Sequence, residues 1–160
     1  METLYKYVVA GHAFGVLLPD AFPAQKYLRP YEPFAASSDV DTLFTLKLST
    51  VESLKDTAPG KVRECFNDEA PYFWIFEDED GKFSFGFSYT RERPDCILKT
   101  SADFVDSVVY IPESSSERIA EFAISNAMML LYTFCTSPYQ TLMVHASVIR
   151  HDGLGYMFLG

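Results

Sequence analysis

The stretch YFWIFEDEDGKFSFGFSY, residues 72–89, constrains the fold of this chain most strongly. Its first part, Tyr72–Phe76, is aromatic and β-prone. Asp80 and Gly81 supply the positive-φ residues that a tight turn requires. In the return segment, small residues alternate with the aromatic residues Phe83, Phe85, Phe87 and Tyr89. Because alternate residues of a strand share a face, the stretch predicts an antiparallel hairpin whose aromatic face belongs to the core.

Strand patterns on both sides of this hairpin extend it into a sheet. Tyr5–Pro19 favours two short strands joined by a turn. The segment LFTLKLST, residues 43–50, alternates apolar and polar side chains and predicts a half-buried strand. Two further strands are predicted at residues 95–100 and 106–112.

Two intervening segments lack a regular pattern. Asp20–Asp41 is rich in proline and predicts a long excursion with one helical turn. Residues 51–65, VESLKDTAPGKVREC, are polar and predict irregular structure. His12 and His151 are predicted to be surface turn residues.

One long helix is predicted from about Ser115 to Cys135. Ser114 and Glu117 match the capping box S-x-x-E, in which each side chain satisfies a backbone amide of the other residue. Apolar residues recur at helical spacing, and the second half of the helix is apolar nearly all round. We therefore expect this half to be covered on both sides, with three buried residues: Leu130, Leu131 and Phe134.

The last predicted element is a hairpin. Leu142–Arg150 runs outward, His151–Gly153 forms the turn, and Gly155–Leu159 returns. The class is therefore α+β: a mostly antiparallel sheet, one long helix in the C-terminal half and a final β-hairpin. We expect an N-terminal α+β domain over residues 1–141, while residues 142–160 form a hairpin leading into a missing nucleotide-binding domain; a single domain is the alternative.

Composition excludes some classes of partner. The net charge is −9, whereas nucleic acids and anionic membranes select clustered lysine and arginine, so neither is an expected partner. A secretory signal begins with basic residues followed by an apolar run, and the N-terminus of this chain lacks this pattern. The apolar segment Ile119–Cys135 is judged too short to span a bilayer and carries Glu121 and Asn126. Three widely spaced cysteines suggest neither a disulfide framework nor a zinc ribbon, so a cytoplasmic location is expected.

The C-terminal residue Gly160 directly follows the apolar strand pattern Tyr156–Leu159. A phosphate-binding loop, G-x-x-x-x-G-K-[ST], begins in this way, with its first glycine after the last strand residue. We therefore predict that Gly160 is the first glycine of such a loop. Its lysine and its metal-binding hydroxyl would follow this residue. The simpler alternative is that Gly160 is only a chain end.

The segment VHASVIRHDGLGYMFLG, residues 144–160, resembles the sequence just before the phosphate-binding loop of the HPr kinase/phosphorylase family and its relatives with a phosphoenolpyruvate-carboxykinase-like nucleotide core. The positions on the pattern are His145, Ala146, Gly153, Gly155 and Gly160. This match covers about residues 142–160. The preceding residues carry no motif of the N-terminal domain of the HPr enzymes and look more like the leader domain of small HPr-kinase-related proteins.

The resemblance implies that the chain is the non-catalytic N-terminal part of an ATP-dependent phosphotransferase, serving substrate recognition, domain packing or oligomerisation. The parent protein would use ATP and magnesium, whereas residues 1–160 themselves are expected to hold no cofactor. The expected partners are the following kinase domain and a second copy of the chain. His145 would lie near the reacting phosphates, where a histidine can shuttle protons. A structural histidine in a strand is the alternative.

Other functional interpretations remain open. One is a free-standing binding or scaffold domain without catalytic activity; another is a small hydrolase that uses His145. A triad of Ser147, His145 and Asp152 lacks the glycines of a nucleophile elbow. The acidic run Glu77–Asp80 lacks the ligand spacing of a calcium loop and is predicted to be a solvated turn. No metal site is therefore expected.

Overall fold

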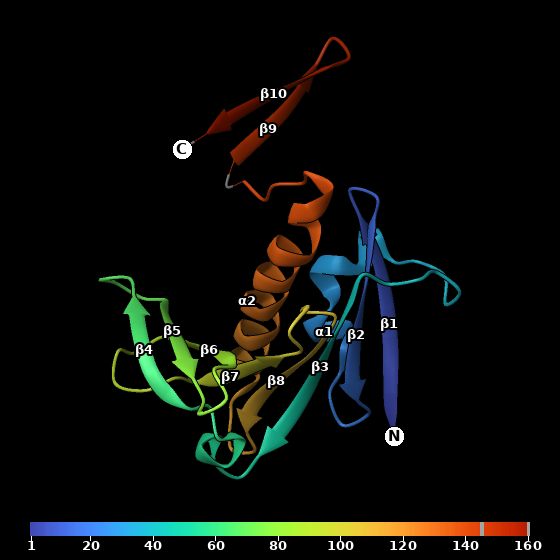
Figure 1. Cartoon of the computed structure of the whole chain (residues 1–160). Helices are drawn as coiled ribbons and strands as arrows, with labels where there is room; N and C mark the ends of the chain where they lie inside the picture. Colours follow the sequence, from blue (N-terminus) through green and yellow to red (C-terminus); the bar gives the residue numbers. More distant parts are fainter. Residues whose placement is uncertain (145, 160) are drawn as a thin grey trace.

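The computed structural model describes residues 1–144 and 146–159 (Figure 1). Its main sheet has eight strands in the order β1-β2-β3-β8-β7-β6-β5-β4. The strands are β1 Glu2–Val9, β2 His12–Pro19, β3 Phe44–Val51, β4 Lys61–Phe66, β5 Tyr72–Glu77, β6 Phe83–Ser88, β7 Cys96–Thr100 and β8 Asp106–Pro112. The helices are α1 Ala24–Tyr27 and α2 Glu117–Thr136, with 3-10 helices η1 Arg29–Phe34, η2 Leu54–Thr57 and η3 Ser137–Tyr139.

The predicted α+β class with a mostly antiparallel sheet is confirmed. The pairs β2–β3 and β3–β8 are parallel, and the other neighbouring pairs of this sheet are antiparallel. The chain leaves β3, forms η2 and the meander β4–β7, and returns as β8 beside β3. This crossover places β3 and β8 at the centre of the sheet. Leu46, Leu48 and Val109 on these strands are fully buried.

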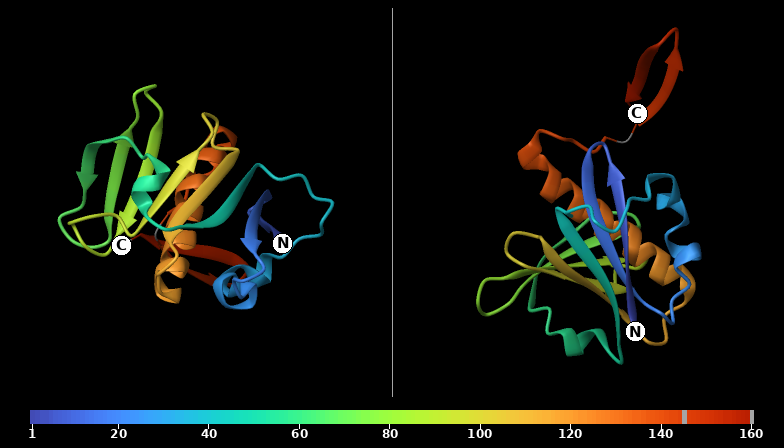
Figure 2. Two further views of the ribbon diagram at one scale, coloured as in Figure 1. Left: turned by 90° about the horizontal axis from the view of Figure 1, so that it is seen from below. Right: turned by 90° about the vertical axis from the view of Figure 1, so that its right-hand side faces the viewer.

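Helix α2 lies across one face of the sheet (Figures 1 and 2). Leu131 is fully buried there, but 51% of Met129 and 44% of Phe134 are exposed. The expectation that the second half of this helix is covered on both sides is therefore wrong. The reason is that one curved sheet covers only one side of the helix. Phe134 nevertheless stacks on Phe104, with ring centroids 4.7 Å apart.

The start of α2 differs from the predicted capping box. The N-cap is Ser116, and its side chain makes no capping hydrogen bond to the described residues. Because the helix begins at Glu117, this residue is the first helical residue and not the third, which a capping box requires; it forms an ion pair with Lys26 of α1. A capping box does form at η2, where Ser53 Oγ accepts from Lys55 N and Asp56 Oδ2 accepts from Ser53 N.

Residues 51–65 are more regular than their sequence suggests. They contain η2 and β4, and β4 pairs with β5 through a register shift between Val62 and Glu64. Apolar and polar side chains do not alternate clearly in β4, because β4 is an edge strand and most of its residues are exposed. The missing apolar periodicity therefore reflects an uncovered strand, not an irregular loop.

Both sides of β6 are covered. Phe85 and Phe87 join the core, as the alternation predicts, whereas 51% of Phe83 is exposed at the strand start. On the other side, Ser84 and Ser88 are also buried. The second face of the sheet is therefore partly covered by loops.

By length and composition, the helical segment Glu117–Tyr139 is long and apolar enough to cross a membrane. Length therefore does not exclude a spanning helix, contrary to the estimate from Ile119–Cys135. The core helix of a globular domain passes the same test. The buried side of α2 packs with residues of the sheet in one core cluster, which identifies it as a core helix.

The final hairpin is present as predicted. Strands β9 (Ala146–His151) and β10 (Leu154–Leu159) pair in a separate two-stranded sheet. Asp152 and Gly153 form its turn with positive φ angles of 50° and 79°. In Figures 1 and 2 the hairpin extends beyond the C-terminal end of α2, away from the main sheet.

The packing of α2 predicts a contrast between two of its residues. Leu131→Ala should lower the free energy of unfolding by about 2–5 kcal/mol because it leaves a cavity under the sheet. Met129→Ala, on the exposed side, should change it by less than about 1 kcal/mol. Urea denaturation of both variants measures the difference; equal effects would contradict one-sided packing.

Candidate functional site

Two residues predicted from the sequence, His145 and Gly160, lie outside the described residues. The described neighbours are the ends of the hairpin: β9 begins at Ala146 and β10 ends at Leu159. The hairpin geometry therefore leaves the assignments of the candidate catalytic histidine and the first loop glycine as predictions.

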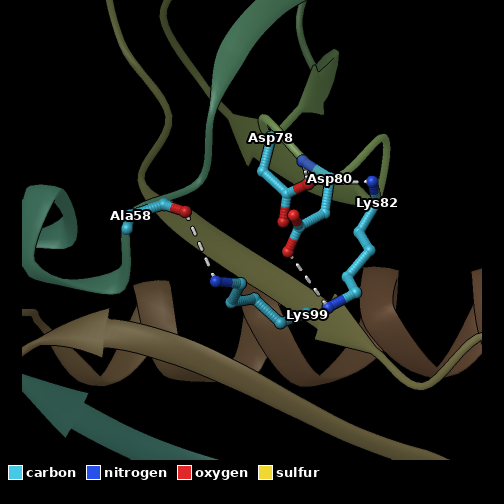
Figure 3. Close-up of polar contacts among 5 residues, drawn as sticks. All are labelled: Ala58, Asp78, Asp80, Lys82 and Lys99. Carbon is cyan, nitrogen blue, oxygen red and sulfur yellow. Dashed lines mark hydrogen bonds and ion pairs between the residues drawn. The ribbon is translucent and has the colours of Figure 1, made fainter.

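The acidic turn between β5 and β6 uses its carboxylates internally (Figure 3). Asp78 Oδ1 accepts hydrogen bonds from the backbone amides of Asp80 and Lys82 at 3.0 and 2.9 Å. Asp80 pairs with the Lys82 ammonium at 3.5 Å. Within the described part of the chain, no group of three histidine, cysteine or acidic residues is arranged to hold a metal ion. This turn is therefore held together by its own hydrogen bonds.

Two of the three cysteines, Cys96 and Cys135, are unsuited to nucleophilic chemistry. Cys65, Cys96 and Cys135 are free thiols. Burial raises the pKa of Cys96 well above its usual range, and burial also raises the pKa of Cys135 to about 11. Both thiols are therefore protonated near neutral pH, whereas a nucleophilic cysteine requires the thiolate.

A cavity of about 780 Å³ lies between strands of the sheet, the loops beside η2 and β7, and the start of α2. Three segments line it: residues 52–60 around η2, residues 93–97 before and within β7, and residues 112–119 at the start of α2. Apolar side chains contribute to its lining, among them Phe76 and Ile97. The cavity thus joins segments that are far apart in the sequence, and we call it the η2 cavity.

The first wall of the η2 cavity is tied to three strands. Lys99 of β7 donates hydrogen bonds to the carbonyl oxygens of Thr57 and Ala58 at 2.7 and 3.3 Å (Figure 3). Ser84 of β6 donates to Pro59 O at 2.8 Å. Gly60 has a φ of 96°, and a Cβ there would lie 2.3 Å from the carbonyl oxygen of Glu77 in β5. Only glycine permits this close approach.

The second wall is held by Asp95. Its Oδ2 accepts hydrogen bonds from Ser88 Oγ at 3.1 Å and from the Tyr89 amide at 2.8 Å. The amide of Asp95 in turn donates to Phe87 O at 2.9 Å. These bonds close the loop between β6 and β7, and they fix the position of the backbone that carries Arg93.

The third wall is the connection from β8 to α2. The Glu113 amide donates to Val51 O at 2.8 Å, which joins this connection to the end of β3. The Ser115 amide donates to Pro112 O at 2.9 Å and forms a turn before the helix. All three walls are therefore attached to the sheet by named hydrogen bonds.

The charged residues of the lining are Glu52, Lys55, Arg93 and Asp95. Neither Lys55 nor Arg93 forms an ion pair or donates a side-chain hydrogen bond to another described residue. The lining includes no histidine or cysteine.

The sequence analysis missed this cavity. Its wall residues carry weak local signals, such as the pair Pro59-Gly60 and the serine run Ser114–Ser116. Each signal alone indicates only a turn or a helix start. The strand order, which brings the three segments together, was not readable from these patterns.

His12 is predicted to be a surface turn residue, but it is the first residue of β2 and is partly buried. Its Nε2 lies 2.8 Å from Thr141 Oγ1, and its ring lies against Tyr139, with centroids 5.5 Å apart. Tyr132 near the end of α2 donates to Val9 O at 2.9 Å. The turn between β1 and β2 therefore contacts the segment that leads from α2 toward the final hairpin.

Comparison with known proteins found no matching family model, no matching curated protein and no matching solved structure. The resemblance to the HPr kinase/phosphorylase family therefore rests on residues 142–160 alone, and it stays a prediction.

Gly60 provides a test of the first wall. Gly60→Ala should destabilise the protein by more than about 1 kcal/mol, because the new Cβ meets the Glu77 backbone in a positive-φ conformation. Gly153→Ala is the matched control, since it has a similar φ of 79° but nothing within 4 Å of the new atom. Thermal unfolding compares the two; an equal or smaller loss for Gly60→Ala would show that the wall can move freely.

His12 provides a test of the connection to the hairpin. His12→Ala removes the contacts with Thr141 and Tyr139, so chymotrypsin should cleave after Tyr139 or Leu142 several-fold faster. His151→Ala, at the exposed hairpin tip, should leave these rates unchanged. Mass spectrometry of the early fragments measures both rates, and unchanged cleavage in His12→Ala would mean that this contact does not hold the segment.

Proposed function

We propose that residues 1–160 form the non-catalytic N-terminal part of an HPr-kinase-like, ATP-dependent phosphotransferase. In this proposal the β9–β10 hairpin leads into a phosphate-binding loop whose first glycine is Gly160. Residues 1–141, which we call the body, serve recognition of the phosphoryl acceptor, packing of the kinase domain or oligomerisation. The protein would act in the cytoplasm.

The observation that carries the proposal is the isolation of the final hairpin. It pairs with no strand of the main sheet among the described residues. Its apolar residues Ile149, Leu154 and Met157 are 54%, 61% and 56% exposed. A lone two-stranded hairpin is marginally stable in water, because it cannot bury an apolar face. A hairpin of this kind fits a sheet to which another part of the parent protein contributes.

Catalysis in the parent would come from groups that follow Gly160. Phosphoryl transfer depends mainly on positioning and on neutralising the charge of the transferred group. Loop amides, a lysine and magnesium would supply the compensating positive charge. ATP would be the donor of the phosphoryl group. His145 is the residue of this chain proposed to lie near the phosphates, and the contact of His12 with Thr141 would help to set the direction in which the hairpin leaves the body.

A free-standing binding or scaffold domain is the second candidate function. The η2 cavity favours it, because the cavity is lined entirely by residues of the body and none of the hairpin. Such a site would work without a kinase domain. The two candidates differ in what they require after Gly160.

The source gene gives the first test. Codons for glycine, lysine and serine or threonine within about eight residues after Gly160 are expected. Calorimetry with ATP and magnesium gives the second test. The 160-residue chain should show no binding, whereas a chain extended through the loop should bind, and replacing the loop lysine by alanine should abolish that binding. A stop codon after Gly160, or micromolar ATP binding by the 160-residue chain, would contradict the proposal.

The exposed hairpin also bears on the expected second copy of the chain. If its apolar face is covered by the following domain, the 160-residue chain should self-associate through the hairpin more than the extended chain does. Light scattering with and without Met157→Lys separates this association from contacts elsewhere. Equal association of the two chains would point to the body instead.

A further inference from the structure

We infer that the η2 cavity binds a small organic anion, with an apolar body in the cavity and a carboxylate or phosphate group near Lys55 and Arg93. This inference does not rest on the proposed kinase function, because every lining residue belongs to the body of the chain. It goes beyond that function by assigning a ligand class to residues 52–119.

The cavity has the size and apolar surface of a small-molecule site. Its volume of about 780 Å³ lies within the range of about 300–1,000 Å³ that is usual for such sites. Leu54, Pro94 and Ile119 are partly exposed apolar residues of the lining, so they present surface that a ligand can contact. Ile97 and Phe76, at 0% and 5% exposure, support this lining from beneath. Such a lining favours a ligand with a hydrocarbon or aromatic body.

The cations of the lining favour a ligand that carries a negative group. The chain has a net charge of −9, yet this lining contains two cations, from different walls, that have no ion-pair partner among the described residues. The lining also holds two carboxylates: Asp95, whose Oδ2 accepts hydrogen bonds from Ser88 and Tyr89, and Glu52. Both disfavour an anion beside them. We therefore place the ligand's anionic group near Lys55 and Arg93.

The walls are formed before a ligand arrives. Lys99 and Ser84 hold the η2 wall, while Asp95 closes the loop that carries Arg93. A preformed site loses less conformational entropy on binding than a loop that must become ordered. The structure thus combines volume, apolar lining, fixed walls and two cations that have no ion-pair partner in residues 1–144 and 146–159.

A pair of fluorescent probes tests the inference on the 160-residue chain. 1-Anilinonaphthalene-8-sulfonate has an apolar body and one anionic group, and N-phenyl-1-naphthylamine is the same body without the sulfonate. The anionic probe should bind at least about fivefold more tightly than the neutral probe. The double variant Lys55→Gln/Arg93→Gln should remove this preference, because the difference comes from the two cations.

Matched variants separate the cavity from other apolar surfaces, the hairpin included. Arg91→Gln/Lys82→Gln removes two positive charges outside the lining, as many as Lys55→Gln/Arg93→Gln removes within it. This control variant should keep the preference for the anionic probe. Ser115→Phe places a large side chain in the cavity and should weaken the binding of both probes. Ser38→Phe, outside the lining, should weaken the binding of neither. Circular dichroism verifies that each variant is folded; if Ser115→Phe is not, the charge variants still decide.

A competition series then distinguishes the two head groups. Octanoate, octyl phosphate and 1-octanol share one chain and differ only in the carboxylate, the phosphate or the neutral hydroxyl. At least one of the anions should displace the probe at a concentration about fivefold lower than octanol does, and the better anion identifies the head group. Equal displacement by all three, or equal probe binding in wild type and Lys55→Gln/Arg93→Gln, would overturn the inference.

Discussion

The parallel pairing of β3 with β8 brings together parts of the chain that are separated by the whole β4–β7 meander. Leu46, Leu48 and Val109 on these two strands are fully buried, and they belong to the core cluster in which Leu131 of α2 also lies. Burial of such side chains is the main favourable contribution to folding. The sheet order, the position of α2 and the three walls of the η2 cavity all depend on this central contact.

The body and the final hairpin are stabilised by different contacts. The body has a continuous core, and its loops are tied to the sheet by side chains such as Lys99, Ser84 and Asp95. Among the described residues, the hairpin strands pair with each other and with no strand of the main sheet, and apolar residues on both strands are exposed. The joint between them is the segment that His12 contacts through Thr141. The inferred ligand site therefore belongs to the body, and the proposed link to a nucleotide-binding domain belongs to the hairpin.

Local patterns predicted most of the elements because alternation and helical spacing are local properties. The aromatic hairpin at residues 72–89, the long helix and the final hairpin all follow from neighbouring residues. Errors arose where distant contacts decide. Strand β4 shows no apolar alternation because it is an exposed edge. Phe134 is half exposed because one sheet covers only one side of α2.

The candidate site was less predictable than the fold. Its lining comes from three segments, and no spacing in the sequence indicates that the strand order joins them. The sequence pointed instead to His145 and Gly160 at the end of the hairpin, where the pattern is local. The two assignments are thus complementary: one depends on a motif, and the other depends on the tertiary structure.

Native-state hydrogen exchange tests most directly whether the body is a complete unit and the hairpin depends on a following domain. In the 160-residue chain, amides of β3 and β8 should exchange only through global unfolding, whereas amides of β9 and β10 should exchange with little protection. Extension of the chain through the proposed loop and its following domain should raise the protection of β9 and β10 toward that of β3. Protection of the hairpin equal to that of β3 in the 160-residue chain would contradict this account.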